Sequence, residues 1–259
     1  MDPRRLARRE LTILAVVVLA LTRVTDGPAL VAVTGLFLAV LVMGALVIFA
    51  EGEPAGVPIE SLMPVAAAGI AAVAIVRVVP VGALLLPAIG AAALLIHVVV
   101  GVEARITSQA RTPDERDRRS VLWASLATCF VAFIGLPTAV VDVGLSAAWA
   151  AWAAWALSIA EGTVAALLGY RLAALRRPDL RSAAFSALTY GAIIGLAGAA
   201  LRVLALPRLV EPALLVLVFY LWDAVHATKP ARRRGVRWML ELAVLAVLGV
   251  AVVFLVGRT

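Results

Sequence analysis

Cysteine, histidine, lysine and aromatic residues are all scarce in this chain of 259 residues. The single cysteine, Cys129, excludes an internal disulfide and any metal or iron–sulfur site built from several cysteines. The only lysine, Lys229, lies in a predicted loop, which excludes a retinal Schiff base inside the membrane. The two histidines, His97 and His226, fall at different predicted depths, which argues against a haem held by paired histidines. The sequence therefore predicts no cofactor and no metal.

Sequence motifs of catalysis are also missing. The chain has no GxSxG elbow, no HExxH helix and no P-loop, and its predicted loops are too short to hold a soluble active site. We predict no catalytic residue, and the sequence favours a protein that is not an enzyme.

Apolar residues, in contrast, are in large excess. They make up 64% of the chain and give a mean hydropathy of +1.05, whereas soluble proteins are about 45–50% apolar. The net charge of +7 would suggest a nucleic-acid partner in a soluble protein. Here most basic residues lie in loops that would face an anionic leaflet, so we expect membrane lipids as partners and no nucleic acid.

The spacing of the apolar runs predicts an all-α, polytopic membrane helix bundle that forms one domain over 1–259. The first run is the least secure span, because its uncharged core extends only from Leu11 to Thr22. Nine spans are predicted, at 8–24, 29–50, 61–79, 81–103, 121–141, 145–170, 183–206, 212–227 and 237–257.

The distribution of basic residues predicts a cytoplasmic N-terminus and an extracytoplasmic C-terminus. With nine spans, 18 basic residues lie in cytoplasmic segments and 5 outside, as the positive-inside rule requires. The loop 51–60 has no basic residue and is the weak point of this topology. The preference for arginine over lysine and the Ala/Val bias indicate the plasma membrane of a prokaryote.

Local signals add detail to two helices. Thr112, Pro113 and Glu115 resemble an N-cap, a first-turn proline and a capping-box glutamate at the start of the fifth helix. Gly191 and Gly195 form a GxxxG pair, which predicts close packing of the seventh helix against a neighbour.

Small residues predict which polar side chains point into the bundle, because membrane helices pack through their small faces. Arg202 shares a face with Gly191, Glu161 lies on an alanine and serine stripe, and His97 aligns with Gly90, Ala93 and Gly101. On the sixth helix Trp149, Trp152 and Trp155 occupy another side and are expected to face lipid.

Four polar residues are candidates for ligand binding: Glu161, His97, Arg202 and Arg77. Carboxylates inside a membrane cost about 2.5–3.5 kcal/mol on insertion scales, which makes Glu161 a functional candidate. His97 lies at a similar predicted depth and would meet Glu161 if the fourth and sixth helices were neighbours.

Each candidate also has a structural interpretation. Glu161 and His97 can be hydrogen-bonded inside the bundle, while Arg77 and Arg202 can reach the outer headgroups or pair with Asp142. Asp223 and His226, one helical turn apart, are expected to form a solvated pair at the interface.

Three hypotheses of function remain open. The first is a permease or carrier that binds a small or lipidic ligand. The second is a non-catalytic subunit or scaffold that binds other membrane subunits. The third is a membrane-embedded enzyme acting on a lipid-linked phosphate, with arginines on the phosphate and a carboxylate as base.

Overall fold

The computed structural model describes residues 3–50, 57–108, 113–144, 147–176, 179–204, 206–227 and 247. All regular structure in these ranges is helical, and no strand occurs in them. The elements are α1 (Pro3–Thr22), α2 (Gly27–Ala50), the short 3-10 helix η1 (Ile59–Ser61), α3 (Met63–Val78), α4 (Leu85–Thr107), α5 (Glu115–Val143), α6 (Ala147–Ala174), α7 (Leu180–Val203) and α8 (Val210–Ala227).

Seven segments, which correspond to α2 through α8, are long and apolar enough to cross a membrane, the pattern of a multi-pass membrane protein. The helix α1 is not among them, because it carries four arginines and Glu10 within its 20 residues. The predicted ninth span, 237–257, lies outside the described residues. The all-α membrane class is therefore supported, whereas the count of nine spans stays a prediction.

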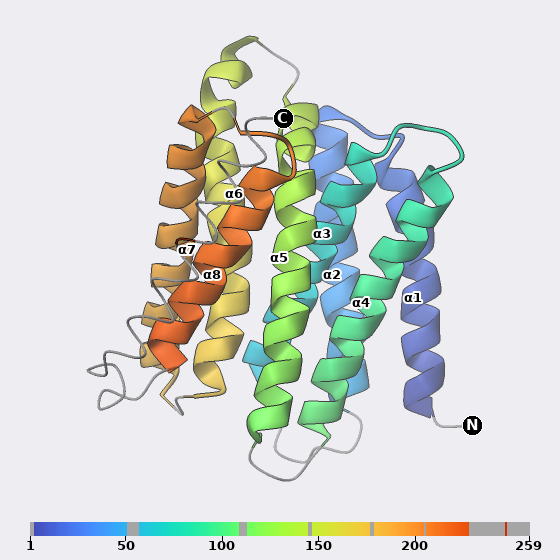
Figure 1. Ribbon diagram of the computed structural model, residues 1–259. Coiled ribbons are helices and arrows are strands. Elements are labelled where there is room, and N and C mark those ends of the chain that lie inside the picture. Colours follow the sequence, from blue (N-terminus) through green and yellow to red (C-terminus); the bar gives the residue numbers. More distant parts are fainter. Residues whose placement is uncertain are drawn as a thin grey trace.

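The helices form a bundle in which α1 to α4 lie on one side and α6 to α8 on the other, with α5 between them (Figure 1). We call α1 to α4 the first group and α5 to α8 the second group. Buried apolar residues form two clusters, one inside the first group and one mainly inside the second. Helix α3 contributes Val65, Ala68 and Ala72 to one cluster and Ala67 and Ala71 to the other. Helix α3 therefore packs against both groups.

Small residues allow α3 to approach α5 very closely. Eleven of its 16 residues are buried, and most of them are alanine or valine. On α5, Gly135 lies so near that a Cβ atom there would overlap the backbone of Ala74. The contact between the two groups is thus made by backbone and short side chains rather than by large interlocking ones.

The predicted GxxxG face of α7 packs against α6. A Cβ atom at Gly191 would lie 2.9 Å from the Gly162 carbonyl oxygen, and one at Gly195 would lie 3.0 Å from that of Ser158. Trp152 and Trp155 are each 66% exposed, which places them on the side of α6 that a lipid environment would contact. The packing of the glycine face is confirmed, and Trp152 and Trp155 are exposed as predicted, while the Trp149 side chain lies outside the described residues.

Helix starts differ in detail from the sequence prediction. The N-cap of α5 is Asp114, not Thr112, and Asp114 and Asp117 form a reciprocal capping box. Threonine and aspartate are both favoured at N-caps, but only Asp114 directly precedes the first helical residue, Glu115. At the start of α2, Gly27 has φ of 60°, a left-handed conformation that favours glycine.

The close α3–α5 contact predicts a position-specific cost for an added methyl group. Gly135→Ala should lower the free energy of unfolding by about 1–3 kcal/mol, because an overpacked interface must shift. Gly90→Ala in α4 is the matched control, since its Cβ would meet nothing within 4 Å and alanine favours a helix by roughly 0.5–1 kcal/mol. Unfolding in detergent micelles measures both, and equal stability of the two variants would contradict the close contact.

Candidate functional sites in the helix interfaces

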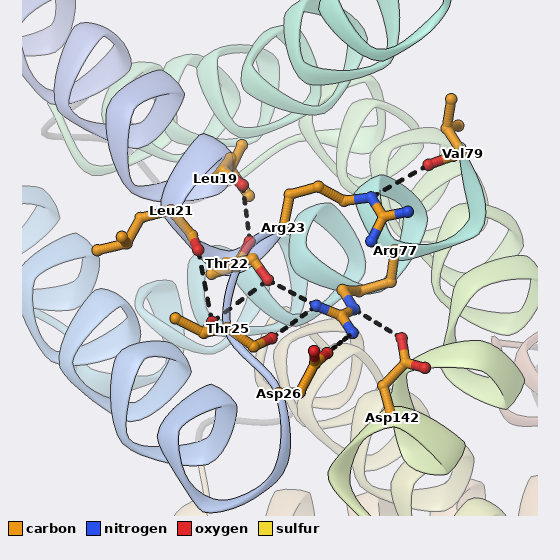
Figure 2. A network of polar contacts seen from close by, with 9 residues as sticks. All are labelled: Leu19, Leu21, Thr22, Arg23, Thr25, Asp26, Arg77, Val79 and Asp142. Carbon is orange, nitrogen blue, oxygen red and sulfur yellow. Dashed lines mark hydrogen bonds and ion pairs between the residues drawn. The ribbon is translucent and has the colours of Figure 1, made fainter. Parts of the chain in front are cut away.

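Arg77, in the last turn of α3, is the centre of a polar cluster at one end of the bundle (Figure 2). Its Nε donates to Asp142 Oδ2 on α5 over 2.6 Å, and its Nη2 donates to Asp26 Oδ1 in the loop between α1 and α2. Its Nη1 donates to the carbonyl oxygens of Thr22 and Thr25 at 2.8 and 2.7 Å. The cluster therefore ties α1, α2, α3 and α5 together.

Four of the five N–H groups of the Arg77 guanidinium donate to these acceptors. The side chain is only 2% exposed, whereas the carboxylates of Asp26 and Asp142 are 65% and 27% exposed. The exposed part of this cluster is consequently acidic. The expected pairing of Arg77 with Asp142 is present, and every nitrogen of Arg77 already has an acceptor that an incoming anion would have to displace.

Glu161 of α6 and Arg202 of α7 form an ion pair between the two helices. Arg202 Nη1 lies 3.1 and 3.0 Å from the two carboxylate oxygens of Glu161, and Arg202 Nη2 donates to Ser158. The Glu161 side chain is 1% exposed. The carboxylate reaches α7 at Gly198, where any side chain would overlap it. Two of the four candidate residues are thus in direct contact.

A second carboxylate faces the same arginine. Glu211, in the first turn of α8, has its Oε1 atom 3.5 Å from Arg202 Nη1. That oxygen is buried and has no hydrogen-bond donor among the described residues. The Arg202 guanidinium therefore lies within ion-pair distance of two carboxylates.

His97 belongs to a different interface from Glu161. Its Nδ1 lies 3.0 Å from the Thr12 hydroxyl on α1, and its backbone carbonyl accepts from Arg8 Nη2 at 2.9 Å. Glu161 pairs with Arg202 on α7, which also lies near Glu211 on α8. The structure thus gives His97 and Glu161 separate partners and does not join them in one hydrogen-bonded site.

Sequence reasoning missed a buried ion pair between α4 and α6. Arg171 Nη2 and Nε donate to the two carboxylate oxygens of Glu103 at 2.7 and 3.2 Å, and the side chains are 5% and 1% exposed. The predicted spans end at 103 and 170, which puts Glu103 at a helix end and Arg171 in a loop. The helices continue to Thr107 and Ala174, so both charges lie inside the bundle. A buried charge needs a partner of opposite sign, and this requirement is the signal that could have linked Glu103 to Arg171.

The predicted solvated pair of Asp223 and His226 is wrong. Asp223 is 3% exposed and accepts from both Arg176 Nη2, at 2.6 Å, and the Tyr190 hydroxyl, at 2.7 Å. His226 instead packs its ring near Tyr190 and Trp222, and its Nδ1 lies 2.9 Å from the Trp222 carbonyl oxygen. Burial lowers the pKa of Arg176, just past the end of α6, but its bond to Asp223 outweighs this and raises it overall.

An apolar groove lies between the two groups of helices, near the Arg77 cluster. It has a volume of about 320 Å³, at the lower end of the range for ligand pockets. Its walls come from α2, α3 and α5, and include Leu30, Val73 and Val143. Val143 directly follows Asp142, so the groove begins next to the acidic side of the cluster.

The described residues include no group of three or more histidine, cysteine, aspartate or glutamate side chains arranged to hold a metal ion. Comparison with known proteins finds no matching family model, no similar curated protein and no similar solved structure. The chemistry of the interfaces must therefore carry the functional argument alone.

The pair of Glu103 and Arg171 gives a thermodynamic prediction. Glu103→Gln should lower the free energy of unfolding by about 3–5 kcal/mol, because it leaves a buried guanidinium without a counter-charge. Adding Arg171→Met should recover much of this loss, since the double variant buries no charge. A double-mutant cycle measured by unfolding in mixed micelles tests the coupling.

The exposed i,i+4 pair of Glu115 and Arg119 provides the control for this cycle. Its side chains are 63% and 72% exposed, so Glu115→Gln should change stability little. Strictly additive effects of Glu103→Gln and Arg171→Met would show that the buried pair is not coupled.

Proposed function

We propose that this protein is a carrier-like membrane protein that binds a small or lipidic ligand between its two groups of helices. The observation that carries the proposal is the position of two ion pairs that cross this interface. Arg77 and Asp142 link α3 to α5, and Glu103 and Arg171 link α4 to α6.

The two crossing pairs lie at opposite ends of the bundle. Arg77 and Asp142 are in the last turns of α3 and α5, which run in the same direction. Glu103 and Arg171 are near the ends of α4 and α6, which run the opposite way (Figure 1). A carrier that alternates access needs one contact that can separate at each end. Among the described residues, the pair of Arg77 and Asp26 stays within the first group, and the pairs of Arg176 with Asp223 and of Arg202 with Glu161 stay within the second.

The Arg77 end is built to separate at lower cost than the other. If Asp142 moved away, Arg77 would keep Asp26 and two carbonyl oxygens, and the partly exposed Asp142 would reach water. Separation of Glu103 from Arg171 would leave two fully buried charges without partners. We therefore expect the interface to open first at the Arg77 end.

The groove between α2, α3 and α5 supports an apolar or amphiphilic ligand. It lies at the same interface and begins beside the Arg77 cluster, where opening would widen it. Its lining is apolar apart from Thr34, which suits an acyl or isoprenoid chain better than a polar solute.

The topology and location remain part of this proposal. We propose nine spans, a cytoplasmic N-terminus and the plasma membrane of a prokaryote, on the charge distribution of the sequence. In this orientation the Arg77 end faces outward and the Glu103 end faces the cytoplasm.

A scaffold in a membrane assembly is the second candidate function. It is favoured by one observation: Glu161, Arg202, Arg77, Asp142 and Asp223 all have partners within the chain, as expected where polar groups only hold helices together. The two functions differ in whether the groups of helices move.

Distances between spin labels on the two groups distinguish a carrier from a scaffold. With Cys129 replaced by alanine, labels at Leu84 and Val203 report on the Arg77 end, and labels at Ser108 and Leu180 report on the other; all four positions are exposed. In lipid nanodiscs, Asp142→Asn should increase the population with a long distance at the first pair only. Glu103→Gln should do so at the second pair only.

A label pair within the first group, Val24 and Leu84, is the control and should keep one distance in every variant. Narrow distance distributions that are identical in wild type and both variants would reject the carrier and favour the scaffold.

A further inference from the structure

We propose that the cluster of Glu161, Glu211 and Arg202 is a proton-binding site that holds one proton at neutral pH. This inference goes beyond the proposed function and does not depend on it, because a proton can be bound whether or not the helix groups move.

The geometry of the cluster sets two carboxylates against one guanidinium. Arg202 Nη1 lies 3.0 Å from Glu161 Oε2 and 3.5 Å from Glu211 Oε1, while Arg202 Nη2 donates a hydrogen bond to the Ser158 hydroxyl. Nη1 has two hydrogens, which cannot satisfy the two oxygens of Glu161 and the oxygen of Glu211 equally well. The buried Glu211 oxygen is consequently left without a donor among the described residues.

Among the residues that the structure describes, the neighbouring helices bring no unpaired cation that could balance the second carboxylate. At this end α3 and α5 contribute Arg77 and Asp142 and the α1–α2 loop contributes Asp26, and Arg77 is bonded to both carboxylates. In the loop before α8, Arg208 is exposed and has no described ion pair with either glutamate. The described part of the site therefore carries a charge of −1 when both carboxyl groups are ionised.

One bound proton brings the charge of this cluster from −1 to zero. In a medium of low dielectric constant, two carboxylates that share one cation do not both stay ionised, since an uncompensated buried charge is costly. One proton from water converts one carboxylate into a carboxylic acid, whose hydroxyl can donate to the other carboxylate or to a carbonyl. The proton belongs to the pair of glutamates and not to either one. The Glu211 side chain is 22% exposed, whereas that of Glu161 is 1% exposed.

Infrared spectroscopy of the full chain in nanodiscs tests this directly. The wild type should show the C=O stretching band of a carboxylic acid at neutral pH, and this band should disappear as the pH is raised. Glu211→Gln and Glu161→Gln should each remove it, because each leaves one carboxylate facing one guanidinium. Arg202→Gln should strengthen it, since two carboxyl groups then share no cation.

Glu115→Gln is the control, because it removes an exposed carboxylate that lies outside this cluster and should leave the band unchanged. If Glu161→Gln fails to fold, Glu211→Gln at the start of α8 still tests the site. Absence of the band from the wild type, or its persistence in either folded glutamine variant, would overturn the proposal.

Discussion

A charge that a membrane bundle removes from water must find a counter-charge inside the bundle, and this constraint governs the arrangement of the helices here. Helix α6 and the residues directly after it carry three charges that are paired in this way. Its Glu161 pairs with α7, its Arg171 with α4, and Arg176, just past its end, with α8. Together with the close approach of Gly162 to Gly191 on α7, these ion pairs fix which face of α6 meets each neighbouring helix.

The sequence predicts those features that depend on a single helix. Span lengths follow from the thickness of a bilayer, so α2 to α8 begin and end within a few residues of the predicted limits. The face of Gly191 and Gly195 and the exposed side of Trp152 and Trp155 follow from helical periodicity alone. Periodicity even identified Arg202 and Glu161 as inward-pointing, which the structure bears out.

What could not be predicted depends on which helices are neighbours. His97 and Glu161 seemed to share a depth, but depth brings residues together only when their helices touch, and His97 faces α1 instead. Glu103 and Arg171 were overlooked because charges near a predicted helix end are usually solvated. To predict their pairing, one must know that α4 and α6 come together at that end. Contacts between distant segments are not contained in any local pattern.

The two ion pairs that link the first group of helices to the second bear on function because buried ion pairs add little net stability. Replacing such a pair by well-packed apolar residues is often neutral or stabilising. A bundle selected only for rigidity would therefore fill the positions of Glu103 and Arg171 with apolar side chains, as it fills the faces of α3 with alanine and valine. A charge pair differs from an apolar contact in that its members can be rehydrated one end at a time. The short side chains of α3 make the contact between these ends, and the two charge pairs are the places where the groups can be rehydrated, as the proposed alternating access requires.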